Sequence, residues 1–224
     1  MKLYMHPAST ASRPVRLLIA EKKLPVEEHV VDILTGAHHK EPYSTMNPNR
    51  MVPWLEDGDL KLTESSAILK YLASKFELPE YPKDLKKRAK VDEAMDWFNT
   101  QFYRDYGYGL AYPQMFPHHK RPTSEVQSGT IDWAKERAQG WLTLLDQHWI
   151  GPKKAFVCGD QITIADYFGA CIVTVGYVIR YDFSKYPNVQ RWLANVEKLG
   201  AWKQTSEAIM GFANMVKDQP FVTV

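Results

Sequence analysis

The stretch Asn47–Leu72 carries three features that suit the capture of a small anionic ligand. Val52–Pro53 opens a short apolar run, and a proline after an extended residue can expose that residue's backbone to a ligand. Asp57–Gly58 lies between two strand-like runs and predicts a tight hairpin turn. Thr63–Ser66 leads into an apolar-periodic helix, whose first N–H groups are free to bind an anion. Together these features predict a backbone-lined pocket for a small acidic peptide or a phosphate.

Ser12 is the second candidate for chemistry. It precedes Arg13–Pro14, and serine is a good N-cap while proline is tolerated in a first helical turn. Its hydroxyl therefore has two interpretations, a helix cap or a group that contacts a ligand, and the residue types leave both open. Ser9 and Thr10 offer a hydroxyl in the same loop.

The composition excludes several classes of protein. A chain of 224 residues with 45% hydrophobic and 24% charged residues is typical of one or two globular domains. A formal net charge of +2 gives no reason to expect nucleic acid or an anionic membrane as partner. No apolar run has the length of a membrane span, and the N-terminus has no signal-like apolar segment. We therefore expect a cytoplasmic protein.

Cysteine and histidine usage predicts no metal site. Cys158 and Cys171 are far apart in the sequence and form no CxxC pattern, which fits a reducing compartment. The pairs His38–His39 and His118–His119 have no cysteine or carboxylate at ligand spacing.

The first part of the chain predicts a mixed sheet with helices on its faces. A helix between the first two strands implies that these strands are parallel, whereas the hairpin must be antiparallel. We expect this domain to cover residues 1–78. Its predicted elements are a strand Lys2–His6, a helix Arg13–Lys23, a strand Glu27–Asp32, a hairpin of Pro53–Glu56 with Lys61–Thr63, and a helix buried through Ala67, Ile68, Tyr71 and Leu72.

The second part predicts an all-helical domain. After a proline-marked linker, residues 79–85, the chain contains no convincing strand, and we expect residues 86–224 to form helices. Apolar residues three and four apart indicate a long buried helix face. Its members are Val91, Met95, Phe98, Phe102 and Tyr106. Thr163 and Asp166 match a capping box before a strongly apolar helix, and we interpret this pair as structural.

The chain resembles the cytosolic glutathione transferase superfamily over nearly its whole length. The resemblance rests on four short blocks, of which the middle ones are the most specific. These are Ser12–Arg16, Asn47–Pro48 with Met51–Pro53, Glu64–Ile68 and Thr163–Asp166. It implies a thioredoxin-like N-terminal domain, a helical C-terminal domain and a homodimer. Glutathione would be the cosubstrate, with no other cofactor.

The resemblance implies that Ser12 is the catalytic residue, as in the serine-type theta and delta classes. Tyr4 belongs to the first strand, which disfavours a tyrosine-type enzyme. No cysteine stands between Pro7 and Pro14, which disfavours thiol–disulfide oxidoreductases and omega-like members. Whether Ser9 or Thr10 replaces Ser12 stays open.

The resemblance also implies the residues that hold glutathione. Val52 would pair its backbone with the cysteinyl part, before a cis Pro53. Glu64 would bind the ammonium of the γ-glutamyl group, and Ser65 would hold its carboxylate. His38 would contact the glycyl end, although the adjacent His39 is an alternative. Met51 stands where relatives often carry a lysine, which leaves the contact to the glycyl carboxylate open.

The pocket for the electrophilic substrate is the least determined part of the site. An aromatic-rich stretch ends the long helix, and apolar ligands prefer such linings. We select Tyr106 and Phe116 as its lining. Arg104 either steadies an anionic leaving group or is a solvated helix charge.

These residues predict a glutathione transferase, in which the glutathione thiolate attacks a small apolar electrophile. Halides, ethers and peroxides remain open as substrates. The alternative is a non-enzymatic relative that binds glutathione or an apolar ligand. The presence of Ser12, Glu64 and Ser65 favours the enzyme.

Overall fold

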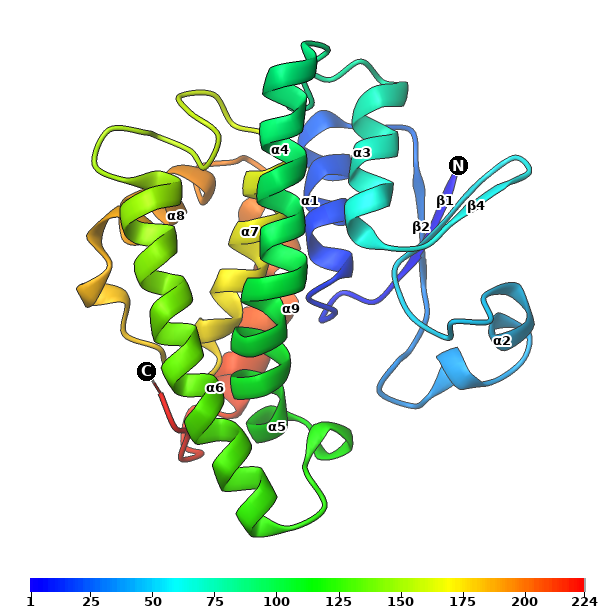
Figure 1. The fold of residues 1–224 in the computed structure, drawn as a ribbon. Helices are drawn as coiled ribbons and strands as arrows, with labels where there is room; N and C mark the ends of the chain where they lie inside the picture. Colours follow the sequence, from blue (N-terminus) through cyan, green and yellow to red (C-terminus); the bar gives the residue numbers. More distant parts are fainter. Residues whose placement is uncertain (224) are drawn as a thin grey trace.

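Four short strands form a mixed sheet in the computed structural model, which describes residues 1–223 (Figure 1). The strands are β1 (Lys2–Met5), β2 (Glu27–Val30), β3 (Trp54–Asp57) and β4 (Leu60–Leu62), in the order β2-β1-β3-β4. Strand β1 pairs parallel with β2 and antiparallel with β3, and β3 pairs antiparallel with β4. The parallel pair and the antiparallel hairpin confirm the predicted mixed sheet, and the pairing of β1 with β3 completes it. Gly58, at φ 63°, supplies the left-handed residue that the β3–β4 turn requires.

Two helices cover the sheet and connect it to the rest of the molecule. They are α1 (Ser12–Lys22) and α3 (Ser65–Lys75), while the short α2 (Tyr43–Met46) follows a 3₁₀ turn at Ala37–His39. Leu3 and Leu55 of the sheet share one buried core with Leu18 of α1. Helix α1 also packs against two helices of the C-terminal part, so its two faces bury different neighbours.

The C-terminal domain is helical, as predicted (Figure 1). Its principal helices are α4 (Leu85–Trp97), α5 (Tyr112–Met115), α6 (Ser124–Leu144), α7 (Ile164–Val173), α8 (Pro187–Val196) and α9 (Trp202–Met215). Helix α4 continues into α5 through π-helical turns at Phe98–Phe102 and Arg104–Ala111, and α6 ends in a third, Leu145–Ile150. Shorter 3₁₀ turns occupy Pro117–His119, Thr174–Tyr177 and Phe183–Lys185.

The predicted buried face of the long helix is confirmed, since every one of its five members is at most 1% exposed. The capping box is confirmed as well. The Thr163 backbone N–H donates to the Asp166 carboxylate at 2.8 Å, and the Asp166 backbone completes the pair. The buried helix face and the capping box both stabilise the interior of the helical domain.

Helix α1 lies at the junction of the two domains, where it packs on α7 and α9. Its first turn therefore reaches the space between the domains. None of the helices in residues 1–223 combines the length and apolar character needed to cross a bilayer.

Candidate active site between the two domains

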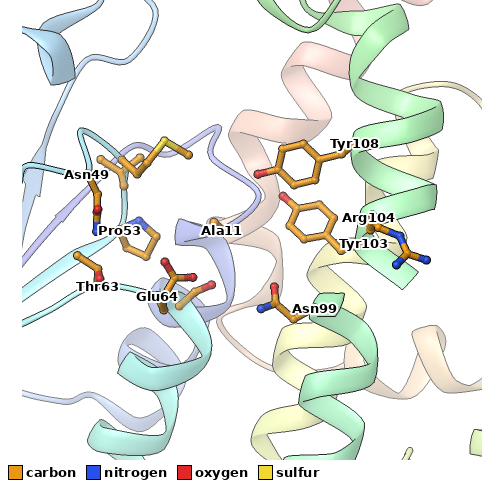
Figure 2. A pocket seen from close by; sticks show the side chains of 12 residues that line it. Ala11, Asn49, Pro53, Thr63, Glu64, Asn99, Tyr103, Arg104 and Tyr108 are labelled. Carbon is orange, nitrogen blue, oxygen red and sulfur yellow. The ribbon is translucent and has the colours of Figure 1, made fainter. Parts of the chain in front are cut away.

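A cleft of about 240 Å³ separates the sheet domain from the helical domain (Figure 2). One wall comes from the loop before β3 and the start of α3, and the other comes from the π-helical stretch after α4. Ala11, at the start of α1, lies between the two walls. The lining residues of the first wall are Asn49, Met51, Val52, Pro53, Thr63, Glu64 and Ser65, and those of the second are Asn99, Tyr103, Arg104 and Tyr108.

The loop before β3 is held by hydrogen bonds to its backbone. The Val52–Pro53 peptide bond is cis, as the resemblance implied. The Met51 carbonyl accepts from the Tyr43 hydroxyl at 2.6 Å and from the Asn47 amide at 2.8 Å. These bonds fix the chain beside Val52, so its peptide groups meet the cleft in one orientation.

Glu64 has an unusual backbone at the start of α3. It occupies the N-cap position with φ 65° and ψ 112°, a region that non-glycine residues rarely adopt. Such strain costs about 1–3 kcal/mol and is concentrated at functional sites. Ser65 begins the helix and is nearly buried, so an acid and the unpaired N–H groups of a helix start adjoin in one wall.

Ser12 is the first residue of α1, and its side chain does not cap the helix. The cap interpretation was therefore wrong, since Ala11 occupies that position. Ser12 is fully buried beside Ala11, and its hydroxyl has no hydrogen-bond partner within residues 1–223. Ser12 is not among the residues that line the cleft, whereas its neighbour Ala11 is. A buried hydroxyl without a partner is costly, so an unused hydrogen-bond donor lies one residue behind the lining.

The two alternative hydroxyls of this loop are already engaged. The Ser9 hydroxyl accepts from the Ser12 N–H at 3.2 Å, next to the Ser9 carbonyl that accepts at 3.1 Å. The Thr10 hydroxyl lies near those of Tyr103 and Tyr112, whose pKa values it lowers against a larger increase from burial. Of the three residues, Ser12 is the one whose hydroxyl is buried without any partner among residues 1–223, while the Ser9 hydroxyl still has its own O–H to donate.

Two tyrosines line the second wall, but Tyr106 is not one of them. Tyr106 is fully buried, and its hydroxyl donates to the Val173 carbonyl at 2.9 Å. Tyr106 belongs to the buried face of the long helix. The expectation that it lines the electrophile pocket is therefore wrong for this cleft. Tyr103 and Tyr108 line the cleft instead, with ring centroids 5.0 Å apart (Figure 2).

The two cleft tyrosines stay protonated at neutral pH. Burial raises the pKa of Tyr108, and the Glu64 carboxylate across the cleft raises it further. Burial also raises the pKa of Tyr103, whose hydroxyl lies 2.5 Å from that of Tyr112. These hydroxyls therefore offer hydrogen-bond donors opposite the glutamate.

Two further residues that were expected at the electrophile pocket, Phe116 and Arg104, do not point into the cleft. Phe116 stacks on Phe212 of α9 at 5.6 Å and does not line the cleft. Arg104 borders the cleft, yet its guanidinium points away and pairs with Asp105 at 2.9 Å (Figure 2).

His38 lies in the loop of the sheet domain, outside the lining of the cleft. Its ring is 3.9 Å from that of His39. Burial lowers the pKa of His38, and the charges of His39 and His118 lower it further. In residues 1–223, no group of three or more His, Cys, Asp or Glu side chains is arranged to hold a metal ion.

Comparisons with known proteins agree with this architecture. Two family descriptions match: "Glutathione S-transferase, N-terminal domain" over residues 3–80, and "Glutathione S-transferase, C-terminal domain" over residues 115–199. Human glutathione S-transferase theta-1 is 34% identical over 213 residues, which cover 94% of this chain and 84% of the relative.

Solved structures show the same likeness. Human glutathione transferase theta-2, in complex with glutathione and an unknown ligand, matches with a TM-score of 0.85 at 26% identity, covering 100% of this chain and 93% of that one. A delta-class glutathione transferase of Nilaparvata lugens matches with a TM-score of 0.80 at 30% identity, covering 96% and 98%. The chain therefore belongs to the glutathione S-transferase family and is a glutathione transferase similar to the theta and delta classes.

Proposed function

We propose that Ser12 activates the thiol of glutathione for attack on a small apolar electrophile. A free cysteine thiol has a pKa of about 8.5, so only a few per cent is thiolate at neutral pH. The unpartnered Ser12 hydroxyl, at the positive end of α1, is the observation that carries this proposal. A hydroxyl that donates to sulfur and a helix N-terminus both favour the anion.

The first wall would hold the peptide part of glutathione. Glu64 would pair with the ammonium of the γ-glutamyl group, while the Ser65 hydroxyl and the N–H groups at the start of α3 would bind its carboxylate. The Val52 backbone, before Pro53, would pair with the cysteinyl residue. His38 would approach the glycyl end from its loop. The wall thus matches a ligand that carries both charges at one end.

The second wall would receive the electrophile. With a halide or an ether the thiolate would form a bond to carbon, and with a peroxide it would form a bond to oxygen. In each case the leaving group would depart with its electron pair, so no metal or organic cofactor enters the reaction. Tyr103 and Tyr108, which line the cleft, replace Tyr106 and Phe116 in this role. A panel of halides, ethers and peroxides distinguishes the open subclasses.

The assembly and location follow the family. We propose a homodimer that works in the cytoplasm, with residues 1–78 forming the glutathione-binding domain and residues 86–224 forming the helical domain after the linker. The two cysteines are unpaired in the structure, in keeping with a reducing compartment.

Replacement of Ser12 by alanine tests the activation step. Loss of a hydrogen bond to a charged sulfur costs about 2 kcal/mol, so kcat/KM with an activated aryl chloride should fall about thirtyfold. The pKa of bound glutathione, followed by ultraviolet absorbance of the thiolate, should rise in parallel. Ser66→Ala is the control, because Ser66 lies one residue inside α3 and should leave the thiol pKa unchanged.

Two results contradict the proposal. Full turnover by the Ser12→Ala enzyme would remove Ser12 from the mechanism and return attention to Ser9 and Thr10. Glutathione binding without turnover of any electrophile in the panel would instead favour the non-enzymatic alternative.

A further inference from the structure

The two ends of the first wall differ in charge. At one end, Glu64 and Ser65 mark the start of α3, and at the other end Met51 and Asn49 line the cleft. Figure 2 shows the Pro53 ring between the side chains of Asn49 and Glu64. The Glu64 end therefore carries the charge of this wall, while the other end offers a thioether and a neutral amide.

Met51 lines the cleft and is also open to solvent, with 57% of the residue exposed. Its carbonyl accepts hydrogen bonds from the Tyr43 hydroxyl and the Asn47 amide, which hold the backbone in place. A methionine side chain has several rotatable bonds and adapts to groups of different shape. A group bound beside Met51 therefore meets an adaptable apolar surface with water next to it.

The cations near the cleft are directed elsewhere. Among the lining residues within 1–223, Arg104 is the one cation, and its guanidinium points away from the cleft and pairs with Asp105 (Figure 2). Arg50 stands next to Met51 in the chain, but it is exposed and is not among the lining residues. An anionic group beside Met51 therefore gains no counter-charge from the lining of the cleft.

The polar groups at this end are uncharged donors. The Asn49 side chain carries an amide N–H. Burial lowers the pKa of His38 in the adjoining loop, and the charges of His39 and His118 lower it further, so the His38 ring is neutral at neutral pH. Neutral N–H groups donate to a carboxylate oxygen or to the carbonyl oxygen of an amide or ester.

We infer that the cleft accepts thiol tripeptides with a neutral third residue, such as glutathione amide or a glutathione ester, about as well as glutathione itself. The inference rests on the proposed function, in which Glu64 and Ser65 bind the γ-glutamyl end and Val52 binds the cysteinyl residue. The third residue then lies beside Met51 and Asn49. A carboxylate there stays hydrated without a counter-charge, so its neutralisation changes the affinity little.

Titration calorimetry with glutathione and with glutathione amide tests the inference. In the wild type, the two Kd values should agree within about threefold at neutral pH, because an exposed charge contributes little. Met51→Lys introduces a cation, so glutathione should then bind about fivefold more tightly than its amide, as expected of a surface ion pair. Added salt should weaken that preference. Met51→Gln, a neutral side chain of similar length, is the matched control and should keep the wild-type ratio of the two Kd values.

Turnover and thermal stability give the same comparison by independent means. With one electrophile, kcat/KM for the two thiols should agree within about threefold, because both carry the same cysteinyl sulfur. At equal concentrations the two ligands should also raise the Tm of the wild type by similar amounts.

Arg50→Ala tests the exposed cation next to Met51 in the chain. The ratio of the two Kd values should stay at the wild-type value, because Arg50 does not line the cleft. If the wild type instead prefers glutathione and Arg50→Ala removes that preference, Arg50 reaches the glycyl carboxylate and the inference is overturned.

Three further outcomes are decisive. A wild type that prefers glutathione to its amide by more than about threefold has a counter-charge at this end, which overturns the inference while the function of Ser12 stands. A Met51→Lys enzyme without a preference for glutathione shows that the third residue does not lie beside Met51, which overturns it as well. A wild type that binds neither thiol contradicts the proposed function, and the inference fails with it.

Discussion

Asp105 anchors the stretch of chain that carries the cleft tyrosines. The residue is 1% exposed and accepts hydrogen bonds from Arg137 at 2.8 Å, from the Trp141 indole at 2.7 Å and from Arg104 at 2.9 Å. We predict that Asp105→Asn destabilises the protein, because the amide carries no charge and turns an N–H group toward donors.

The magnitude follows from the pKa of Asp105. Burial raises it, but the hydrogen bonds from Arg104, Trp141 and Arg137 outweigh burial and lower it from 3.8 to about 2. A shift of this size in the folded state corresponds to about 2 kcal/mol of stability. Because the folded pKa is the lower one, this stability is fully present above the unfolded value and is lost as the pH falls toward about 2.

Urea unfolding at several pH values measures this contribution. At neutral pH the free energy of unfolding should be about 2 kcal/mol lower for Asp105→Asn than for the wild type, and about half of that difference should disappear by pH 3. Asp96→Asn is the control, since Asp96 is exposed on α4. The reasoning fails if Asp105→Asn is as stable as the wild type, or if its deficit does not change between pH 7 and pH 3.

Further predictions concern two other positions. In Gly107→Ala the new Cβ would lie 2.4 Å from the Tyr103 ring, so this ring of the cleft wall must move. The KM for the electrophile should therefore rise, while the Kd of glutathione should stay unchanged. Gly129→Ala in α6, where nothing lies within 4 Å, should instead stabilise the protein by up to about 1 kcal/mol, and equal kinetics for the two variants would refute the argument. Asp166→Ala should lower the free energy of unfolding by about 4 kcal/mol, since it leaves the buried donors of Val157, Thr163 and Trp192 unpaired. A loss below that of the exposed Asp160→Ala in urea titrations would contradict this prediction.

The pairings of β1 with β2 and of β3 with β4 could be predicted from short-range signals, whereas the pairing of β1 with β3 and the ends of the elements could not. The Asp57–Gly58 turn and the helix between the first two strands determine the pairing. Strand β2 ends at Val30, short of the expected Asp32. The Asp32 carboxylate accepts from the backbone N–H groups of Leu34 and Thr35, which turns the chain into a loop. Residue types alone do not show whether the chain continues the strand or forms these side-chain hydrogen bonds.

The tyrosines show why the second wall was misassigned. The sequence pattern assumes an α-helix, in which residues five apart point in different directions. The chain is π-helical around this stretch, and π-helical bonds join residues five apart. Tyr103 and Tyr108 therefore share one side, while Tyr106 stays on the buried face.

Ser12 illustrates a different limit. The residue types around it allowed a cap or a ligand contact, and both readings use the same hydroxyl. The choice depends on where Ser9 places its own hydroxyl and carbonyl, which bond the first N–H groups of α1. The loop between β1 and α1 sets that arrangement, and as a result the Ser12 hydroxyl does not cap α1.

The division of the cleft between two stretches of chain has a consequence for how such enzymes diversify. In the proposed function, segments before Leu72 bind glutathione, and the stretch that begins at Asn99 binds the electrophile. Mutations that enlarge or reshape the tyrosine side can accumulate without touching the peptide side. Substitutions in the tyrosine wall can then give new substrate preferences, while the glutathione-binding wall continues to provide the thiolate.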